Sequence, residues 1–243
     1  MTYCLAIKVD EGLVFGSDTR TSAAVDDVRT YNKSYAFEYP GERVLVMLSA
    51  GNLATTQSLV HRLHHDVETG APLNLRNARN LFAAAEYVGA TSVGIAQASA
   101  QLSQSTADFR VSLILGGQIA GQEPEIYLIY MEGNCISSSV ETPFLQIGET
   151  KYGKPILDRA IHARLGLNDA ARCAMVSLDA TVKSNLSVGP PLDLAFLPRD
   201  TLKLTHLRLD LDSPYYRAAK EAWNQAQIAA LQALPRFPWE PRN

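Results

Sequence analysis

The sequence predicts an α+β fold: a four-layer αββα sandwich with a C-terminal helical extension. Two observations favour this class. Strand and helix patterns come in blocks, in the order strands, helix pair, strands, helix pair, strands. A doubly wound parallel sheet would alternate strand and helix one by one, so the blocks indicate two antiparallel sheets with helices outside them. With 243 residues and 47% hydrophobic content, the chain is able to bury such a core.

The first fifty residues predict four strands. Apolar residues alternate along Tyr3–Val9, and Asp10-Glu11-Gly12 is typical of a hairpin turn. Three further strands are expected at Leu13–Phe15, Thr30–Tyr39 and Arg43–Ser49. The first two strands should pair as a hairpin and return the chain to its start.

Two helices follow, because the apolar period changes after Asn52. Leu59, Leu63 and Val67 recur at every fourth residue, and an Ala-rich stretch extends through Leu75–Gln97. The same order then repeats. Further strands are expected at Val111–Leu115, Ile126–Tyr130, Phe144–Gly148, Leu192–Leu197 and Leu202–Asp210. The second helix pair is expected at Pro155–Leu165 and Ala170–Asn185, with Asn168 or Asp169 as a candidate N-cap of the latter.

The chain beyond Asp210 reads as a separate element. Ser213 is a good N-cap, Pro214 suits the first helical position, and a helix is expected over Tyr215–Leu234. The Pro-rich tail from Pro235 to Pro241 cannot continue that helix and is expected either to dock on a neighbouring subunit or to fold onto its own chain. We therefore predict a main domain over residues 1–210 and an extension over residues 211–243 that serves oligomerisation or packing.

Bulk properties exclude several classes of function. The net charge of −3 leaves no basic face broad enough for nucleic acid. The sequence shows no signal peptide and no apolar run of the roughly 20 residues needed to span a bilayer. Cys4, Cys135 and Cys173 are odd in number and scattered, which suits reduced thiols and predicts a cytoplasmic location.

Thr2 is the candidate nucleophile. A threonine hydroxyl needs an adjacent base, and the residue's own α-amine supplies one when it stands at a free N-terminus. Initiator methionine is generally removed before a small side chain, so loss of Met1 would expose Thr2. The amine's reference pKa of about 7.7 to 8.0 allows it to take the hydroxyl proton near neutral pH.

Three further residues fit the same chemistry. Asp18 lies in Gly16-Ser17-Asp18-Thr19-Arg20-Thr21 at the end of the second strand, back beside the chain start. Lys33, expected on the third strand, would be held by Asp18 and would favour proton loss from Thr2. Gly51 ends a strand that leads into a helix, where unpaired backbone N–H groups can stabilise an oxyanion.

Together these residues resemble the proteasome β-subunit superfamily of N-terminal nucleophile (Ntn) hydrolases. The resemblance covers most of the chain up to about Asp210, and its start, its Asp193-Leu194 segment and its long C-terminal helix look most like the bacterial Anbu family. The resemblance implies an Ntn-hydrolase fold, a self-compartmentalising threonine peptidase and a large homo-oligomer, either ring or open spiral. It implies no metal or organic cofactor, leaves an ATPase unfoldase partner unassigned, and places a substrate pocket around Thr21, Tyr31, Tyr35, Ser49 and Leu53.

The sequence departs from the family around the amine. Gly148-Glu149-Thr150-Lys151 replaces the usual Ser-Gly-Ser segment, and Asn185 and Ser187 stand where an Asp-x-x-Ser-Gly element is expected. Glu149 can hold the terminal amine, but a carboxylate raises the pKa of that amine and makes it a poorer base at neutral pH. We therefore expect weak or narrow peptidase activity.

Other interpretations remain open at this point. His61 and His65 have the i, i+4 spacing of a metal pair, without an evident third ligand. The chain is alternatively a non-catalytic assembly subunit, although the joint presence of Thr2, Asp18 and Lys33 argues against this. A third alternative is an amidohydrolase for a small peptide-like metabolite.

Overall fold

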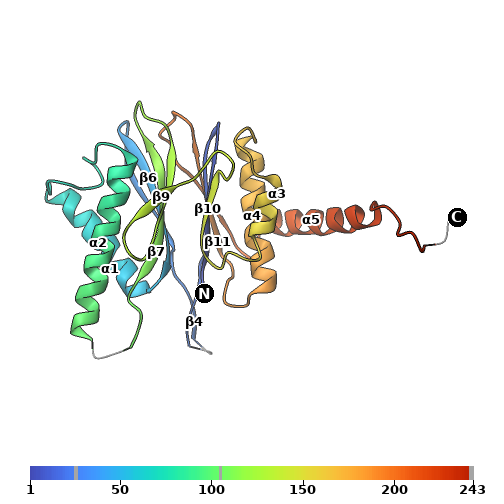
Figure 1. Cartoon of the computed structure of the whole chain (residues 1–243), viewed down its shortest axis with the longest axis horizontal. Helices are drawn as coiled ribbons and strands as arrows, with labels where there is room; N and C mark the ends of the chain where they lie inside the picture. The colour runs from blue at the N-terminus through green and yellow to red at the C-terminus, as the bar shows by residue number, and fades with distance from the viewer. Residues whose placement is uncertain (25–26, 104–105, 241–243) are drawn as a thin grey trace. The chain divides into compact units, whose positions relative to one another are not determined.

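The computed structural model describes residues 1–24, 27–103 and 106–240. Within these ranges, the side chains at positions 22–24 and 27–28 are not described. Two compact units are present, Met1–Leu209 and Asp210–Asn243. Within the first unit, two five-stranded sheets lie face to face, with one helix pair outside each (Figure 1). This arrangement confirms the predicted αββα sandwich.

The first sheet contains the start of the chain. Its strands, in sheet order, are β10 (Phe144–Gly148), β1 (Tyr3–Val9), β2 (Gly12–Asp18), β11 (Leu192–Pro198) and β12 (Thr205–Leu209). Every neighbouring pair is antiparallel, and the expected β1–β2 hairpin places Cys4 opposite Ser17. Asp18, the last residue of β2, therefore lies beside the start of β1.

The second sheet carries the strand that leads into the first helix. Its strands, in order, are β5 (Ser34–Tyr39), β6 (Arg43–Gly51), β7 (Val111–Ile119), β8 (Glu125–Ile129) and β9 (Cys135–Ser137). The helices are α1 (Leu53–Glu68) and α2 (Leu81–Leu102) outside this sheet, and α3 (Lys154–Ala160) and α4 (Leu167–Ser184) outside the other (Figure 1). A separate hairpin pairs β3 (Arg20–Ala24) with β4 (Asp27–Thr30).

Apolar packing explains the layers. Phe15, Val46 and Ile114 belong to a buried cluster between the two sheets, whereas Leu63 and Val88 belong to a second cluster between the helix pair α1–α2 and its sheet. β1 is buried along nearly its whole length, because one face meets the opposite sheet and the other meets α4. The predicted strand is confirmed, and both of its faces are buried.

Several predicted boundaries are wrong, for local reasons. The expected strand Thr30–Tyr39 is interrupted at residues 31–33, where the N–H of Tyr31 bonds to the carbonyl of Thr19 and the carbonyl of Lys33 accepts from Ser49. Lys33 thus precedes β5 instead of lying on a strand.

The helix starts differ as well. α2 begins at Leu81, because the Asn74 side chain accepts two N–H groups of the following turn and Asn80 caps the helix. α4 begins at Leu167 after Gly166, so neither candidate N-cap, Asn168 nor Asp169, holds that position. α3 ends at Ala160, and the last expected strand starts at Thr205.

The second unit contains α5 (Pro214–Gln232), which starts with Ser213 at the N-cap position and Pro214 in the first turn. After the helix, the rings of Phe237 and Trp239 stack at a centroid distance of 4.5 Å. Pro241 of the predicted tail lies outside the described residues.

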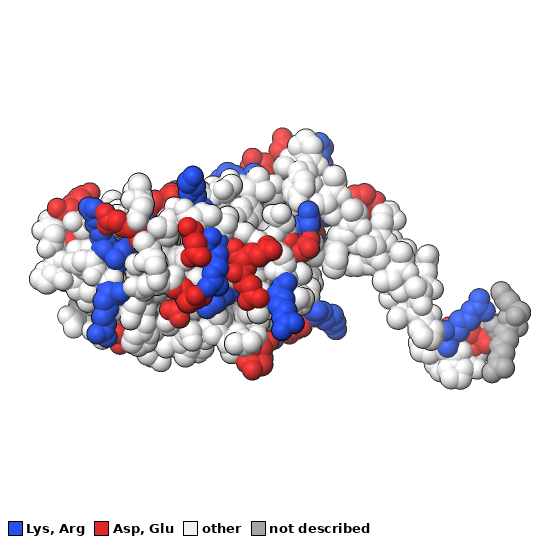
Figure 2. Space-filling view, turned by 90° about the horizontal axis from the view of Figure 1, so that it is seen from above, with Lys and Arg blue, Asp and Glu red and all other residues white. Residues whose placement is uncertain are grey.

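Charge is mixed on the surface of the first unit. Figure 2 shows Lys and Arg interspersed with Asp and Glu on one face. No helix in the described part of the chain is long and apolar enough to cross a membrane.

The contact between the sheets gives a test of the core. A Cβ at Gly116 of β7 would lie 2.7 Å from both Phe15 and Ile126 side-chain atoms, so Gly116→Ala should lower the free energy of unfolding by about 1–3 kcal/mol through overpacking. Urea denaturation measures the loss. Gly94→Ala in α2 is the matched control, because its Cβ meets no atom within 4 Å and a helical alanine should stabilise slightly. Equal stability of the Gly116→Ala variant and the wild type would contradict the packing described.

Candidate active site

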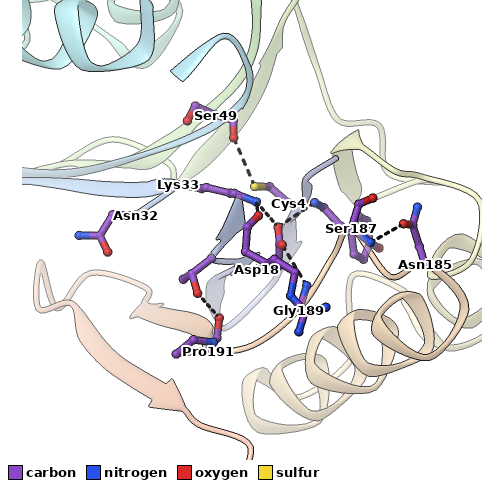
Figure 3. Close-up of polar contacts among 12 residues, drawn as sticks. Cys4, Asp18, Asn32, Lys33, Ser49, Asn185, Ser187, Gly189 and Pro191 are labelled. Carbon is purple, nitrogen blue, oxygen red and sulfur yellow. Dashed lines mark hydrogen bonds and ion pairs between the residues drawn. The ribbon is translucent and has the colours of Figure 1, made fainter. Parts of the chain in front are cut away.

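The carboxylate of Asp18 is the centre of the candidate site. Asp18 is fully buried, and its Oδ1 accepts hydrogen bonds from Lys33 Nζ at 2.8 Å and from the Tyr3 N–H at 3.0 Å. Its Oδ2 accepts from the N–H of Gly189 at 3.2 Å (Figure 3). One carboxylate therefore joins β1 next to Thr2, the segment before β5 and the loop before β11.

The Asp18–Lys33 ion pair is shielded from solvent, with side-chain exposures of 0% and 6%. Burial raises the pKa of Asp18 above its ordinary value, and the Lys33 ammonium and the backbone N–H groups counteract this. Lys33 also donates to the carbonyl of Arg20 at 2.6 Å. These contacts fix a cation beside the start of β1.

The backbone around Thr2 is held by β10. The Thr2 carbonyl accepts from the Glu149 N–H at 2.7 Å, and Gly148 has φ of +83°, where a Cβ would overlap that carbonyl. Side chains alternate along a strand. Cys4 packs into the core between the sheets and Tyr3 bonds to α4 on the opposite face, so Thr2 lies on the inter-sheet face with Cys4.

Glu149, Asn185 and Ser187 form one polar cluster next to Thr2. The Asn185 side chain donates to Glu149 Oε2 at 3.2 Å and accepts from the Ser187 N–H at 2.9 Å. The same amide lies 3.9 Å from the sulfur of Met1. The structure thus brings all three predicted supporting residues to the start of β1.

Gly51 lies where β6 turns into α1. Its φ is +124°, and a Cβ would come within 2.6 Å of the Arg110 carbonyl, so the backbone here requires glycine. Asn52 follows as the N-cap of α1, and its side chain accepts from the Thr55 N–H at 3.1 Å. The predicted strand–glycine–helix turn is present.

A cavity of about 520 Å³ lies beside the segment that precedes Lys33. Its lining residues come from the end of β4, that segment, β5 and α1: Thr30, Tyr31, Asn32, Tyr35, Gln57, Val60 and His61. Tyr31 and Tyr35 of the predicted pocket are among them, whereas Thr21, Ser49 and Leu53 are not. Ser49 is buried, and its carbonyl lies 3.6 Å from the Cys4 thiol (Figure 3).

Comparisons with known proteins decide the family. The family model "Proteasome subunit" matches residues 2–196. Among solved structures, Anbu (ancestral beta-subunit) from Yersinia bercovieri has a TM-score of 0.92 and 40% identity, covering 97% of this chain and 99% of that chain. The structure described as the helical assembly of the Anbu complex from Pseudomonas aeruginosa has a TM-score of 0.93 and 41% identity, with coverages of 98% and 99%. Anbu from Hyphomicrobium sp. strain MC1 has a TM-score of 0.88 and 42% identity, with coverages of 97% and 99%.

The chain belongs to the Anbu family of proteasome-type proteins. The predicted membership and the Ntn-hydrolase fold are thereby confirmed. A search of curated proteins found no match.

Sequence reasoning missed two parts of the candidate site. The N–H groups of Tyr3 and Gly189 bind the Asp18 carboxylate, and Gly189 is 171 residues from its partner. Backbone donors leave no signature in residue type, and only the single glycine, Gly189, before Pro190-Pro191 could have indicated a close approach. Arg20 also escaped notice, although its guanidinium binds the Leu186 carbonyl at 2.8 Å and packs against Gly189.

The surroundings of the α1 histidines bear on the metal pair considered from the sequence. His61 lines the cavity, and the ring of His64 lies 5.0 Å from that of Phe37. Within residues 1–24, 27–103 and 106–240, no group of three or more His, Cys, Asp or Glu side chains is placed to hold a metal.

The buried ion pair gives a prediction with a defined pH dependence. Lys33→Met leaves the Asp18 carboxylate buried without its cation and should cost about 3–5 kcal/mol of unfolding free energy near pH 8. Without the ammonium, burial raises the pKa of Asp18 further, so the folded variant binds a proton at a higher pH than the unfolded chain. Its stability then falls as pH rises through that interval, and the deficit should shrink on acidification toward about pH 5.

Urea denaturation at both pH values measures this dependence. Arg208→Met is the control, because its ion pair with Asp193 is partly exposed and should contribute at most about 1 kcal/mol. A Lys33→Met deficit of the same size at both pH values would contradict the assignment of the charge to Asp18.

Proposed function

We propose that this chain is a threonine-type peptidase that cleaves peptide bonds through an acyl-enzyme, with Thr2 as the nucleophile after loss of Met1. The observation that carries the proposal is the buried Asp18–Lys33 pair, linked to β1 through the Tyr3 N–H, immediately after Thr2. A cation buried at this cost in desolvation suits a site that stabilises developing negative charge.

The proposed reaction follows from the groups around Thr2. Its hydroxyl oxygen attacks the substrate carbonyl, and the free α-amine takes the hydroxyl proton, directly or through one water. Lys33 favours the deprotonated nucleophile, and the Gly51 N–H stabilises the oxyanion of the tetrahedral intermediate. The C–N bond then breaks, the amine product leaves with a proton, and water hydrolyses the ester on Thr2.

Glu149 attenuates this chemistry in our proposal. Its backbone already holds the Thr2 carbonyl, and its side chain is fixed by Asn185. A carboxylate beside the freed ammonium favours the protonated amine, which is not a base. The activity is therefore weak or narrow at neutral pH, with Asn185 and Ser187 as positioning groups.

The cavity at Tyr31 and Tyr35 is the proposed side-chain pocket for a peptide or unfolded segment. Asn32, one of its lining residues, directly precedes Lys33 in the sequence. None of the lining residues is Asp, Glu, Lys or Arg. Thr21, Ser49 and Leu53 remain proposed members of the wider substrate site. No cofactor enters the proposed reaction.

Self-association is the second part of the proposal. The Pseudomonas aeruginosa relative is described as a helical assembly, and we propose that this chain likewise forms a large homo-oligomer in the cytoplasm, with the second unit as an assembly element. A heterologous contact yields a closed ring or an open spiral according to its rotation. Glu149 beside Thr2 is the observation that favours the competing function, a non-catalytic assembly subunit.

The nucleophile assignment is tested by covalent labelling. After incubation with an N-terminal-threonine-directed β-lactone, intact mass should show loss of Met1 and one adduct per chain, and peptide mapping should place the adduct on Thr2. Thr2→Ala should lose the adduct and peptide hydrolysis entirely, because it lacks the attacking oxygen. Thr205→Ala, an exposed threonine of β12, is the control and should be labelled like wild type. Peptide hydrolysis unchanged in Thr2→Ala would remove the basis of the assignment.

The effect of Glu149 is tested by the pH profile of labelling. Glu149→Gln keeps the size of the side chain and removes its charge, so the α-amine should lose its proton at lower pH and the profile should move to lower pH. Glu141→Gln, a charge change on an exposed residue elsewhere, serves as control. If the Glu149→Gln and wild-type profiles coincide, Glu149 does not control the amine.

A further inference from the structure

Tyr3 is anchored on the face of β1 that lies opposite Thr2. Its side chain is fully buried against the α3–α4 layer, and its phenol oxygen lies 2.7 Å from Ser177 Oγ of α4 and 2.6 Å from Gln146 Nε2 of β10. Ser177 and Gln146 form their hydrogen bonds with residues other than Asp18 and Lys33, and the proposed reaction uses neither residue.

The directions of these hydrogen bonds follow from proton counting. Ser177 Oγ donates to the carbonyl of Gly153 at 3.1 Å, which uses its single proton. The Tyr3 phenol must therefore donate to Ser177 and accept from the Gln146 amide. The result is one directed chain, from Gln146 to Tyr3 to Ser177 to Gly153. It joins β10, β1, α4 and the N-terminal end of α3.

The chain of hydrogen bonds is tightly enclosed. A Cβ at Gly153 would lie 2.4 Å from both the Tyr3 and the Ser177 oxygens, so their close approach to this backbone requires glycine. Burial raises the pKa of Tyr3 to about 12, which keeps the phenol protonated as a donor across the working pH range. Thr181 Oγ1 donates to the Ser177 carbonyl at 3.0 Å and braces that turn of α4.

We infer that Tyr3 is a positioning residue for the nucleophile: its phenol, fixed by Gln146 and Ser177, sets the position and rotation of the end of β1 that carries Thr2. This inference rests on the proposed function. Tyr3 is held twice, by its N–H to Asp18 and by its phenol in the helix layer. Thr2 is the next residue along the chain from these anchors, so a rotation of Tyr3 displaces the Thr2 hydroxyl.

The test is Tyr3→Phe, which keeps the ring and removes only the phenol oxygen. In β-lactone labelling of Thr2, the maximal rate constant should fall about tenfold to a hundredfold while the half-saturating concentration stays within about twofold, because misplacement of a nucleophile by less than 1 Å has effects of this order. Ser177→Ala should act in the same direction. The double variant should react about as slowly as the slower single variant, because both substitutions break one chain of hydrogen bonds.

Tyr127→Phe is the matched control. Tyr127 is a buried tyrosine of the other sheet whose phenol donates to Glu125 at 2.9 Å, so its loss also removes a tyrosine hydrogen bond, here a partly buried one. Both variants should lose stability in urea, Tyr3→Phe the more because its phenol makes two hydrogen bonds, but only Tyr3→Phe should slow labelling. Equal labelling rates for Tyr3→Phe and wild type, or an equal slowing in Tyr127→Phe, would overturn the inference.

Hydrogen exchange separates this inference from the proposed function. The amides of the N-terminal peptide should exchange at least about tenfold faster in Tyr3→Phe than in wild type or Tyr127→Phe, because the end of β1 loses an anchor. If wild type is not labelled at Thr2, the proposed peptidase function fails. Unchanged exchange in Tyr3→Phe would show that the phenol does not fix the strand end, whatever the labelling result.

Discussion

A single buried carboxylate organises the start of this chain. Asp18 carries its charge in a place from which water is excluded, so it must be surrounded by donors. The structure supplies them from three segments, through Lys33, the Tyr3 N–H and the Gly189 N–H. Each donor fixes a different piece of backbone, so the electrostatic requirement of one side chain determines where β1 begins, where the chain enters β5 and how the loop before β11 closes.

Side chains alternate along β1, so fixing its backbone at Tyr3 also determines which way the neighbouring side chains face. Cys4 faces the space between the sheets and Tyr3 faces α4, so neighbouring residues are committed to opposite layers. Packing in the helix layer is therefore not independent of chemistry between the sheets. A strand buried on both faces resists rotation, because rotation would pull one side chain out of its layer.

The sequence predicted the structure correctly wherever a hydrophobic period or a turn motif determines it. The β1–β2 hairpin, the strand–glycine–helix turn at Gly51 and the sandwich itself follow from such local patterns. It was insufficient where distant backbone groups decide the structure: the carbonyl of Thr19 draws Tyr31 out of the strand, and Gly189 reaches Asp18 across 171 positions. Local propensity also overextended α2 toward Leu75, because the Asn74 turn competes with the helix.

The Lys33 ammonium and the Glu149 carboxylate act in opposite directions on the proposed α-amine of Thr2. The burial of each group decides which effect dominates. The Lys33 side chain is only 6% exposed, so solvent screens its charge little within the site. Glu149 is only half-buried, and its carboxylate is shared with the Asn185 amide and the Lys151 N–H. Solvent therefore screens Glu149 more than Lys33. On this balance the carboxylate lowers the fraction of unprotonated amine at neutral pH without cancelling the proposed effect of Lys33 on Thr2, which is why we propose an attenuated peptidase over an inert subunit.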